Sequence, residues 1–218
     1  MKIYLATGNK NKKREMSEIL CEHTIVIPSD EGIDFSPVES GSTFSENSMI
    51  KAKALQEIVH CPVIADDSGI CVDALDGAPG IFSSRYAGPA FMQGRPDDKK
   101  ISQDEQNRLL IEQLNEAIKS DNVDFSSFKN GSRSAHYTCS MVLYLEKDRF
   151  FIVQETMEGA IVENIEKASG TGGFGYDPIF FLPQYGKTAA DLSSSEKNAI
   201  SHRGKAARII ARILQSIE

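Results

Sequence analysis

Two adjacent carboxylates, Asp66 and Asp67, lie in the segment Ala65-Asp66-Asp67-Ser68-Gly69. Apolar residues precede the segment at 62–64 and follow it at 70–72, which places the pair at or within a β-strand. Neighbouring side chains of a strand point to opposite faces, so one carboxylate can serve chemistry while the other is structural. Such a pair can hold a hard divalent cation or position a water for attack. The alternative is an Asx-turn between two strands.

A second segment, Gly170-Thr171-Gly172-Gly173-Phe174-Gly175-Tyr176-Asp177-Pro178, combines glycines with aromatic rings and a carboxylate. Glycine allows a ligand to approach the backbone closely. Phe174 offers a flat apolar face, Tyr176 an aromatic ring with a hydroxyl, and Asp177 an acceptor beside a rigid proline. This mixture suits a planar polar ring such as a nucleobase. The alternative is a plain turn before the apolar run at 179–182.

Two predicted helices begin with cations, although the helix dipole favours anions at that end. The first follows an apolar strand at 2–6 and the loop Thr7-Gly8-Asn9, and it starts with Lys10, Lys12, Lys13 and Arg14. The second starts after Ser201 with His202 and Arg203, and Lys197 lies just ahead. A strand, a glycine-containing loop and a helix N-terminus together suit phosphate. Both clusters therefore indicate an anionic partner; solvated helix ends are the alternative.

Taken together, these segments resemble the inosine/xanthosine triphosphate pyrophosphatase family, whose members hydrolyse non-standard purine nucleoside triphosphates. Six motifs of that family occur in order along nearly the whole chain. They are ATGNxxK at 6–12, TFxEN at 43–47, ADDSG at 65–69, GAPGIxSxRYAG at 77–88, GTGGFGYDPIF at 170–180 and EKxxISHRGxA at 196–206. The resemblance implies an α/β fold, with an elongated mixed central sheet and flanking helices forming two lobes around a nucleotide cleft. It also implies magnesium dependence, release of pyrophosphate and a homodimer.

The same resemblance assigns roles to residues of this chain. Asp67 is the catalytic carboxylate at the metal or the attacking water, and Asp66 supports it. Glu39 matches an acidic position that the family uses for Mg²⁺, with Glu46 as its rival because a capping box also explains Glu46. The expected phosphate-binding residues are Thr7, Gly8, Asn9, Lys10, Asn11, Lys12, Lys51 and Ser68. The expected base-binding residues are Phe174, Gly175, Tyr176 and Asp177, and the residues expected at the purine's oxygen edge or the phosphates are Lys197, His202 and Arg203.

Strand and helix signals alternate along the chain, as in an α/β protein. Capping boxes at 43–46 and 102–105 start two amphipathic helices, and Ser201 is the expected N-cap of the last helix. Strands are predicted at 2–6, 23–27, 137–145, 150–156, 159–162 and 179–182. The polar segment 119–134 is predicted to be a mobile loop. We expect one domain over residues 1–218.

Composition limits the classes of function. The net charge of −7 argues against nonspecific nucleic-acid binding. No apolar run approaches the ~20 residues that cross a membrane. The four cysteines show no CxxC spacing and are expected to be reduced thiols in the cytoplasm. Two other functions remain open: a nucleotide-binding module without turnover, and a related pyrophosphatase for pyrimidine or modified nucleotides.

Overall fold

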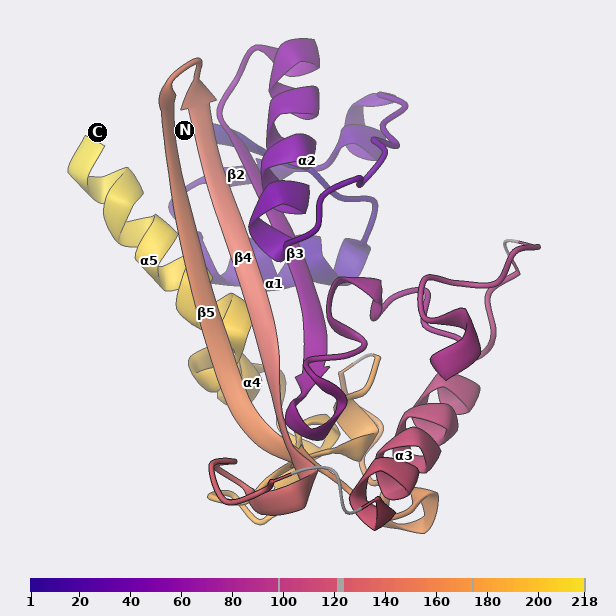
Figure 1. The fold of residues 1–218 in the computed structure, drawn as a ribbon. Helices are drawn as coiled ribbons and strands as arrows, with labels where there is room; N and C mark the ends of the chain where they lie inside the picture. Colours follow the sequence, from indigo (N-terminus) through magenta and orange to yellow (C-terminus); the bar gives the residue numbers. More distant parts are fainter. Residues whose placement is uncertain (98, 121–123, 174, 218) are drawn as a thin grey trace. The chain divides into compact units, whose positions relative to one another are not determined.

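The computed structural model describes residues 1–97, 99–120, 124–173 and 175–217 (Figure 1). Its α-helices are α1 (Lys10–Ile19), α2 (Phe44–Val59), α3 (Gln103–Lys119), α4 (Ser194–Ile200) and α5 (His202–Ile217). Its strands are β1 (Lys2–Leu5), β2 (Thr24–Val26), β3 (Val63–Val72), β4 (Ser134–Glu146), β5 (Arg149–Ile161), β6 (Phe180–Leu182) and β7 (Lys187–Thr188). The strands form one sheet in the order β2-β1-β3-β4-β5-β6-β7. The predicted α/β class with a mixed sheet is confirmed.

The chain divides into two compact units. Unit 1 comprises Met1–Ser68, Thr138–Thr156 and Asn198–Glu218, and unit 2 comprises Gly69–Tyr137 and Met157–Lys197. Several elements, among them β3, β4 and β5, contribute residues to both units.

In unit 1, helices cover both faces of the sheet (Figure 1). Strand β1 pairs in parallel with β2 and with β3. Alternate residues of each strand enter two separate cores, as the period of a strand requires. Ile3, Leu5 and Ile64 pack with residues of α1 and α5, whereas Val63 and Ala65 pack with residues of α2. Successive side chains of β3 are therefore aimed alternately at α1 and α5 or at α2.

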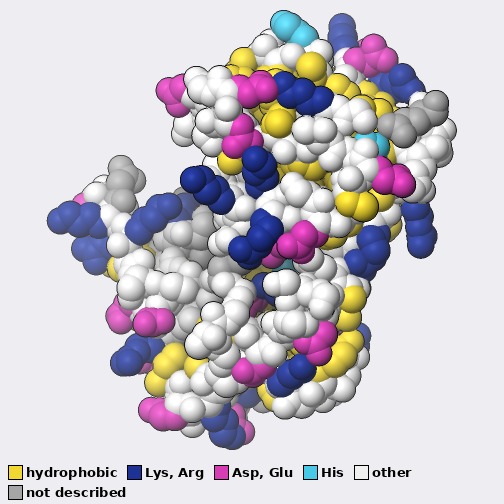
Figure 2. Space-filling view, turned by 180° about the vertical axis from the view of Figure 1, so that it is seen from behind, with side chains coloured by type: hydrophobic (Ala, Val, Ile, Leu, Met, Phe, Trp, Pro, Cys, Tyr) yellow, Lys and Arg dark blue, Asp and Glu magenta, His cyan; other side chains and the backbone are white. Residues whose placement is uncertain are grey.

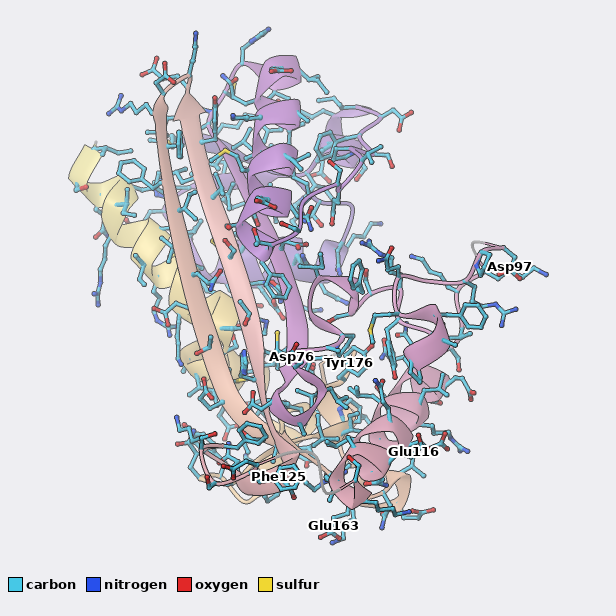
Figure 3. The ribbon with its side chains drawn as sticks, in the orientation of Figure 1. Asp76, Asp97, Glu116, Phe125, Glu163 and Tyr176 are labelled. Atoms are coloured by element: carbon cyan, nitrogen blue, oxygen red, sulfur yellow. The ribbon has the colours of Figure 1, made fainter. Side chains whose placement is uncertain are left out.

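In unit 2, β6 pairs antiparallel with β5 and with the short strand β7. The 3₁₀ helix η8 (Ala189–Asp191) follows β7 directly. The segment 119–134, predicted to be mobile, includes Asn130 and Arg133, whose side chains donate to the carbonyl oxygens of Gly159 at 2.7 Å and Ile161 at 2.7 Å. Phe125, labelled in Figure 3, packs edge-on against Phe128. The described residues of the segment thus have definite contacts, and its mobility stays a prediction.

Three boundaries differ from the sequence prediction. Strand β3 runs without interruption through both aspartates, so the Asx-turn alternative is wrong. The two strands predicted at 150–156 and 159–162 are one strand, β5, because Gly159 stays extended where the ring of Phe180 packs over it. A Cβ on Gly159 would lie 2.5 Å from that ring. Strand β7 was not predicted, because two residues are too few to show the alternation that identifies a strand.

Charge is mixed over the surface. Figure 2 shows Lys and Arg side chains interspersed with Asp and Glu on the face that it draws. Among the helices that the structure describes, none is both long and apolar enough to cross a bilayer.

Candidate active site

Asp66 and Asp67 point to opposite faces of β3 within unit 1. Asp66 follows the alternation of Ile64 and faces α1 and α5, and Asp67 follows Val63 and Ala65 and faces α2. Both residues are buried, at 2% and 9% relative exposure. A buried carboxylate needs charged or hydrogen-bonding partners, and the two aspartates have separate sets, from α1, α5 and β3 for Asp66 and from α2 for Asp67. The predicted division of the pair between two faces is confirmed.

On the α2 face, Lys51 joins two carboxylates. Its ammonium lies 2.9 Å from Asp67 Oδ1 and 3.1 Å from Glu39 Oε1. Burial opposes the charged form of Lys51, but Asp67, Asp66 and Glu39 together raise its pKa, so it is a cation. For Asp67 burial dominates and raises its pKa, although Lys51 opposes the shift. Asp67 is therefore a stronger base than an exposed aspartate.

Asn47 connects the Asp67 carboxylate to the loop that carries Glu39. Its side chain is fully buried, accepts from the Gly41 N–H at 2.8 Å and donates to Asp67 Oδ2 at 3.4 Å. The motif at 43–47 included Asn47, yet no role was predicted for it. Its spacing could have indicated a role, because Asn47 lies four residues before Lys51 and therefore on the same side of a helix.

Glu46, the rival candidate for metal binding, is engaged at the start of α2. Its Oε2 accepts from the backbone N–H and the hydroxyl of Ser42, both at 2.7 Å. These bonds lower the pKa of Glu46. The Thr43 hydroxyl accepts from the Glu46 N–H at 3.1 Å, which is the N-cap bond that the sequence predicts. Glu39, which contacts Lys51 beside Asp67, is the better placed of the two acids.

On the opposite face, Asp66 lies among cations. Its Oδ2 contacts Lys12 Nζ at 2.9 Å and Arg203 Nε at 3.1 Å, and it accepts from the Ser68 hydroxyl at 3.0 Å. Burial alone would raise the pKa of Asp66, but Lys12, Arg203 and Lys51 hold it well below the usual range. Its Oδ1 is buried and has no hydrogen-bond partner among the described residues. Asp66 is thus a fixed negative charge that orders two cations.

Arg203 is bound on two sides by carboxylates of unit 1. Besides the contact with Asp66, its Nη1 donates to Glu15 Oε2 at 2.8 Å, and the residue is only 4% exposed. Glu15, like Asn47, was missed by sequence reasoning; it lies three residues after Lys12 on α1. The cations at the start of α1 and α5 therefore have carboxylate partners within the protein, which accounts for part of the predicted need for an anion.

The loop before α1 already uses several of its polar groups. Asn9 caps the helix, since its Oδ1 accepts from the N–H groups of Asn11 at 2.8 Å and Lys12 at 3.3 Å. Thr7 Oγ1 accepts from the Asn9 N–H at 3.1 Å. Among the described residues, the N–H groups of Gly8 and Lys10 form no hydrogen bond. They are the amides left to face a phosphate at this helix N-terminus.

The base-binding candidates of unit 2 form a second group. Asp177 and Lys197 are an ion pair at 2.5 Å, and both are buried. Tyr176, labelled in Figure 3, donates its hydroxyl to the Ser83 carbonyl at 2.8 Å, and burial raises its pKa. A Cβ on Gly173 would lie 2.1 Å from Asp177 Oδ2, so only glycine fits there. Phe174, the predicted stacking residue, lies outside the described residues.

The structure thus gathers the predicted residues into two sets. Unit 1 holds the two aspartates and Ser68 with their cations and the loop, together with His202 in the first turn of α5, where it is 5% exposed. The Ser201 hydroxyl accepts from the Gly204 N–H at 3.0 Å, as the predicted N-cap of that helix should. Unit 2 holds Tyr176, the Asp177–Lys197 pair and Gly175, which has a positive φ of 68°.

The donor set on the α2 face fits a hard divalent cation. Asp67 and Glu39 already share one cation, the Lys51 ammonium. No cluster of three or more acidic, His or Cys ligands occurs among the described residues. Mg²⁺ usually takes one or two carboxylates and completes its shell with water and substrate phosphate, so the Asp67 and Glu39 oxygens are of the kind that it binds.

Comparisons with known proteins cover the whole chain. A model of the Ham1 family matches residues 3–213. A dITP/XTP pyrophosphatase of Treponema denticola is 51% identical over 215 residues, which are 99% of both chains. The enzyme of the same name from Escherichia coli K12 is 38% identical over 219 residues, covering 99% of this chain and 98% of the relative.

Solved structures agree with these relatives. A HAM1 protein from Coxiella burnetii aligns with a TM-score of 0.81 and 35% identity over 99% of both chains. The Ham1 protein of Staphylococcus aureus aligns with a TM-score of 0.77 and 32% identity over the full length of both. The resemblance predicted from the six motifs is confirmed: the chain belongs to the Ham1 family.

Proposed function

We propose that the protein hydrolyses non-standard purine nucleoside triphosphates, those of inosine, deoxyinosine and xanthosine, to the monophosphate and pyrophosphate. The observation that carries the proposal is the pair Asp66 and Asp67 in β3. One carboxylate orders the cations beside the phosphate loop, and the other lies with Lys51 and Glu39 on the opposite face. The curated relatives named dITP/XTP pyrophosphatase support this substrate class.

Phosphate binding follows from the charges of unit 1. The N–H groups of Gly8 and Lys10 and the ammonium of Lys12 face an anion at the α1 N-terminus. Lys12 lies 2.9 Å from Asp66, and this ion pair orients its ammonium at the start of α1. When Lys12 turns to a phosphate oxygen, Arg203 still compensates the Asp66 charge. Positioned cations of this kind are the main protein contribution to phosphoryl transfer.

Asp67 and Glu39 would hold a Mg²⁺ ion, which when bound supplies charge neutralisation at the phosphate oxygens and polarises phosphorus. Asp67 orients the attacking water and accepts its proton, from a position fixed by its contacts with Lys51 and Asn47. The water oxygen bonds to the α-phosphorus, the bond from that phosphorus to the bridging oxygen breaks, and pyrophosphate leaves with the electron pair. Lys51 stays charged beside Asp67 and stabilises the negative charge of the transition state.

The products give the first prediction. With inosine triphosphate and Mg²⁺ in ¹⁸O-labelled water, phosphorus NMR should show inosine monophosphate and pyrophosphate formed together, with the ¹⁸O in the monophosphate. If water attacks the α-phosphorus, its oxygen becomes part of the monophosphate, so the label must be found there. Label in pyrophosphate would place the attack at the β-phosphorus, and a diphosphate with orthophosphate would contradict the proposed reaction.

Base choice gives the second prediction. The family resemblance gives Lys197 and His202 as hydrogen-bond donors to the base, and such donors should favour purines with a carbonyl at position 6. Adenine presents an amino donor there and leaves a buried donor unpaired, at about 1–3 kcal/mol per group, or roughly ten- to a hundredfold. Guanine keeps the carbonyl but adds a 2-amino group that meets no acceptor, whereas xanthine's 2-oxo group finds donors.

The measurement is kcat/KM for the inosine, xanthosine, guanosine and adenosine triphosphates at one Mg²⁺ concentration. His202→Ala should lower inosine triphosphate hydrolysis more than the residual adenosine triphosphate rate. Equal kcat/KM values for all four nucleotides would rule out a donor pocket.

We also propose that the enzyme is a homodimer in the cytoplasm. The homodimer is what family resemblance supports, and sedimentation equilibrium would measure it. The reducing compartment is what the cysteine pattern favours, because the four cysteines show no CxxC spacing.

A further inference from the structure

The glycine loop, defined here as residues 170–173 and 175–177, is tied to η8 by one carboxylate. Ser169, at the start of the loop, donates its hydroxyl to Asp191 Oδ2 at 2.5 Å. The same oxygen accepts from the Thr188 N–H at 3.1 Å. These hydrogen bonds lower the pKa of Asp191 and keep it ionised. A single carboxylate thus joins the loop to the strand β7 and to η8.

Backbone contacts fit the loop closely onto the same helix. The Gly172 N–H donates to the Ala190 carbonyl at 3.1 Å, and the Ser169 N–H donates to the Pro178 carbonyl at 3.1 Å, which closes the loop at its base. A Cβ on Gly170 would lie 2.4 Å from the Ala190 carbonyl carbon. The loop therefore has no room to shift toward η8, and the Ser169–Asp191 bond opposes movement away from it.

The fixed loop ends at the buried Asp177–Lys197 ion pair. Gly173 touches the Asp177 carboxylate so closely that the path of the loop and the position of Asp177 depend on each other. A displacement of the loop would consequently move Asp177 and its ion-pair partner Lys197, both of them predicted site residues. The described contacts thus run from Asp191 through Ser169 and the glycines to Asp177 within unit 2.

We propose that Asp191 is a positioning residue that acts through Ser169 to set base recognition by the glycine loop. The proposal rests on the proposed function for its substrate and deepens it by naming a determinant of specificity. Asp191 is exposed, and its hydrogen bonds go to Ser169 and Thr188, neither of which is a candidate chemical residue. Its loss should therefore weaken binding of the base and leave the hydrolytic step nearly intact.

The test compares Ser169→Ala, Asp191→Ala and the double variant. Each single variant should raise KM for inosine triphosphate roughly 3- to 10-fold, the value of one hydrogen bond, while kcat stays within about 2-fold. The preference for inosine over adenosine triphosphate should fall by the same factor. Because Asp191→Ala already removes the Ser169 bond along with the bond from Thr188, the double variant should match Asp191→Ala rather than the product of the two single effects.

Two matched variants separate positioning from a general structural role. Ser169→Thr keeps the hydroxyl and should restore the wild-type KM. Asp124→Ala is the control, since Asp124 is an exposed aspartate of unit 2 that accepts from the Ser126 N–H at 2.9 Å, away from the loop. It should change neither KM nor the base preference. Additive effects of Ser169→Ala and Asp191→Ala, or failure of Ser169→Thr to rescue, would overturn the proposal.

A measurement without nucleotide keeps this test apart from that of the proposed function. Amide hydrogen exchange at Gly172 reports its bond to Ala190 and should accelerate in Ser169→Ala and Asp191→Ala but not in Asp124→Ala. If the wild type hydrolyses no inosine triphosphate, the proposed function fails, yet faster exchange would still support the link from Asp191 to the loop. Unchanged Gly172 exchange would refute the link even in an active enzyme.

Discussion

Asp67→Asn should lower kcat for inosine triphosphate at least ~10²-fold, the low end for loss of a positioned acid–base group. The substitution keeps the shape of the side chain and removes the charge that faces Lys51 and a bound Mg²⁺. It also removes the proton acceptor for the attacking water. Lys51 keeps Glu39 as a partner at 3.1 Å, so we expect the variant to fold. The measurement is steady-state kcat and KM, together with the urea midpoint.

Two other aspartate-to-asparagine variants are the comparisons for this result. Asp66→Asn loses the charge that orders Lys12 and Arg203, so it should affect stability and KM more than kcat. Asp148→Asn is the neutral control, because Asp148 is exposed in the β4–β5 turn with a positive φ of 61°, a conformation that asparagine tolerates. If Asp67→Asn folds and keeps normal turnover while Asp66→Asn loses it, the roles of the two aspartates are reversed.

Arg203→Ala should lower the free energy of unfolding by about 3–5 kcal/mol, the usual cost of removing one partner from a buried ion pair. The guanidinium joins Asp66 and Glu15, and without it both carboxylates lose a charged donor in the protein interior. Lys12 remains beside Asp66 and still compensates its charge, so we expect a loss of stability near the lower end of this range. Urea unfolding at pH 7 with a constant m-value would measure it.

Arg203→Lys should recover only part of this loss, since an ammonium cannot reproduce the fork that reaches two carboxylates. Arg212→Ala, on the same helix α5 but exposed, should change stability by no more than about 0.5 kcal/mol. A stability for Arg203→Ala equal to that of Arg212→Ala would show that the buried network contributes nothing to folding. In that case Arg203 would be free for the purine, as the family resemblance predicts.

Local pattern determined much of this protein. The alternation of a strand was enough to predict that Asp66 and Asp67 face opposite ways, because side-chain direction depends only on the neighbouring residues. Capping chemistry at Thr43 and Ser201 likewise predicted where α2 and α5 begin, since a cap is satisfied within one turn. The six motifs determined the family. The continuous strand β5 was missed, because a glycine such as Gly159 usually indicates the end of a strand. Only the packing of the Phe180 ring over it, which the sequence does not show, keeps the strand continuous.

Only the tertiary structure decided which partner each charged side chain has. Arg203 meets Asp66 across 137 positions of sequence, and Asn47 meets Asp67 across 20. The sequence showed the cations at the helix starts but assigned them to an external anion, because nothing local reveals an internal carboxylate. Helix and sheet packing brings those groups together, and burial makes each pairing necessary. The sequence alone therefore predicted the candidate reactive residues, while packing decided which of them contact one another.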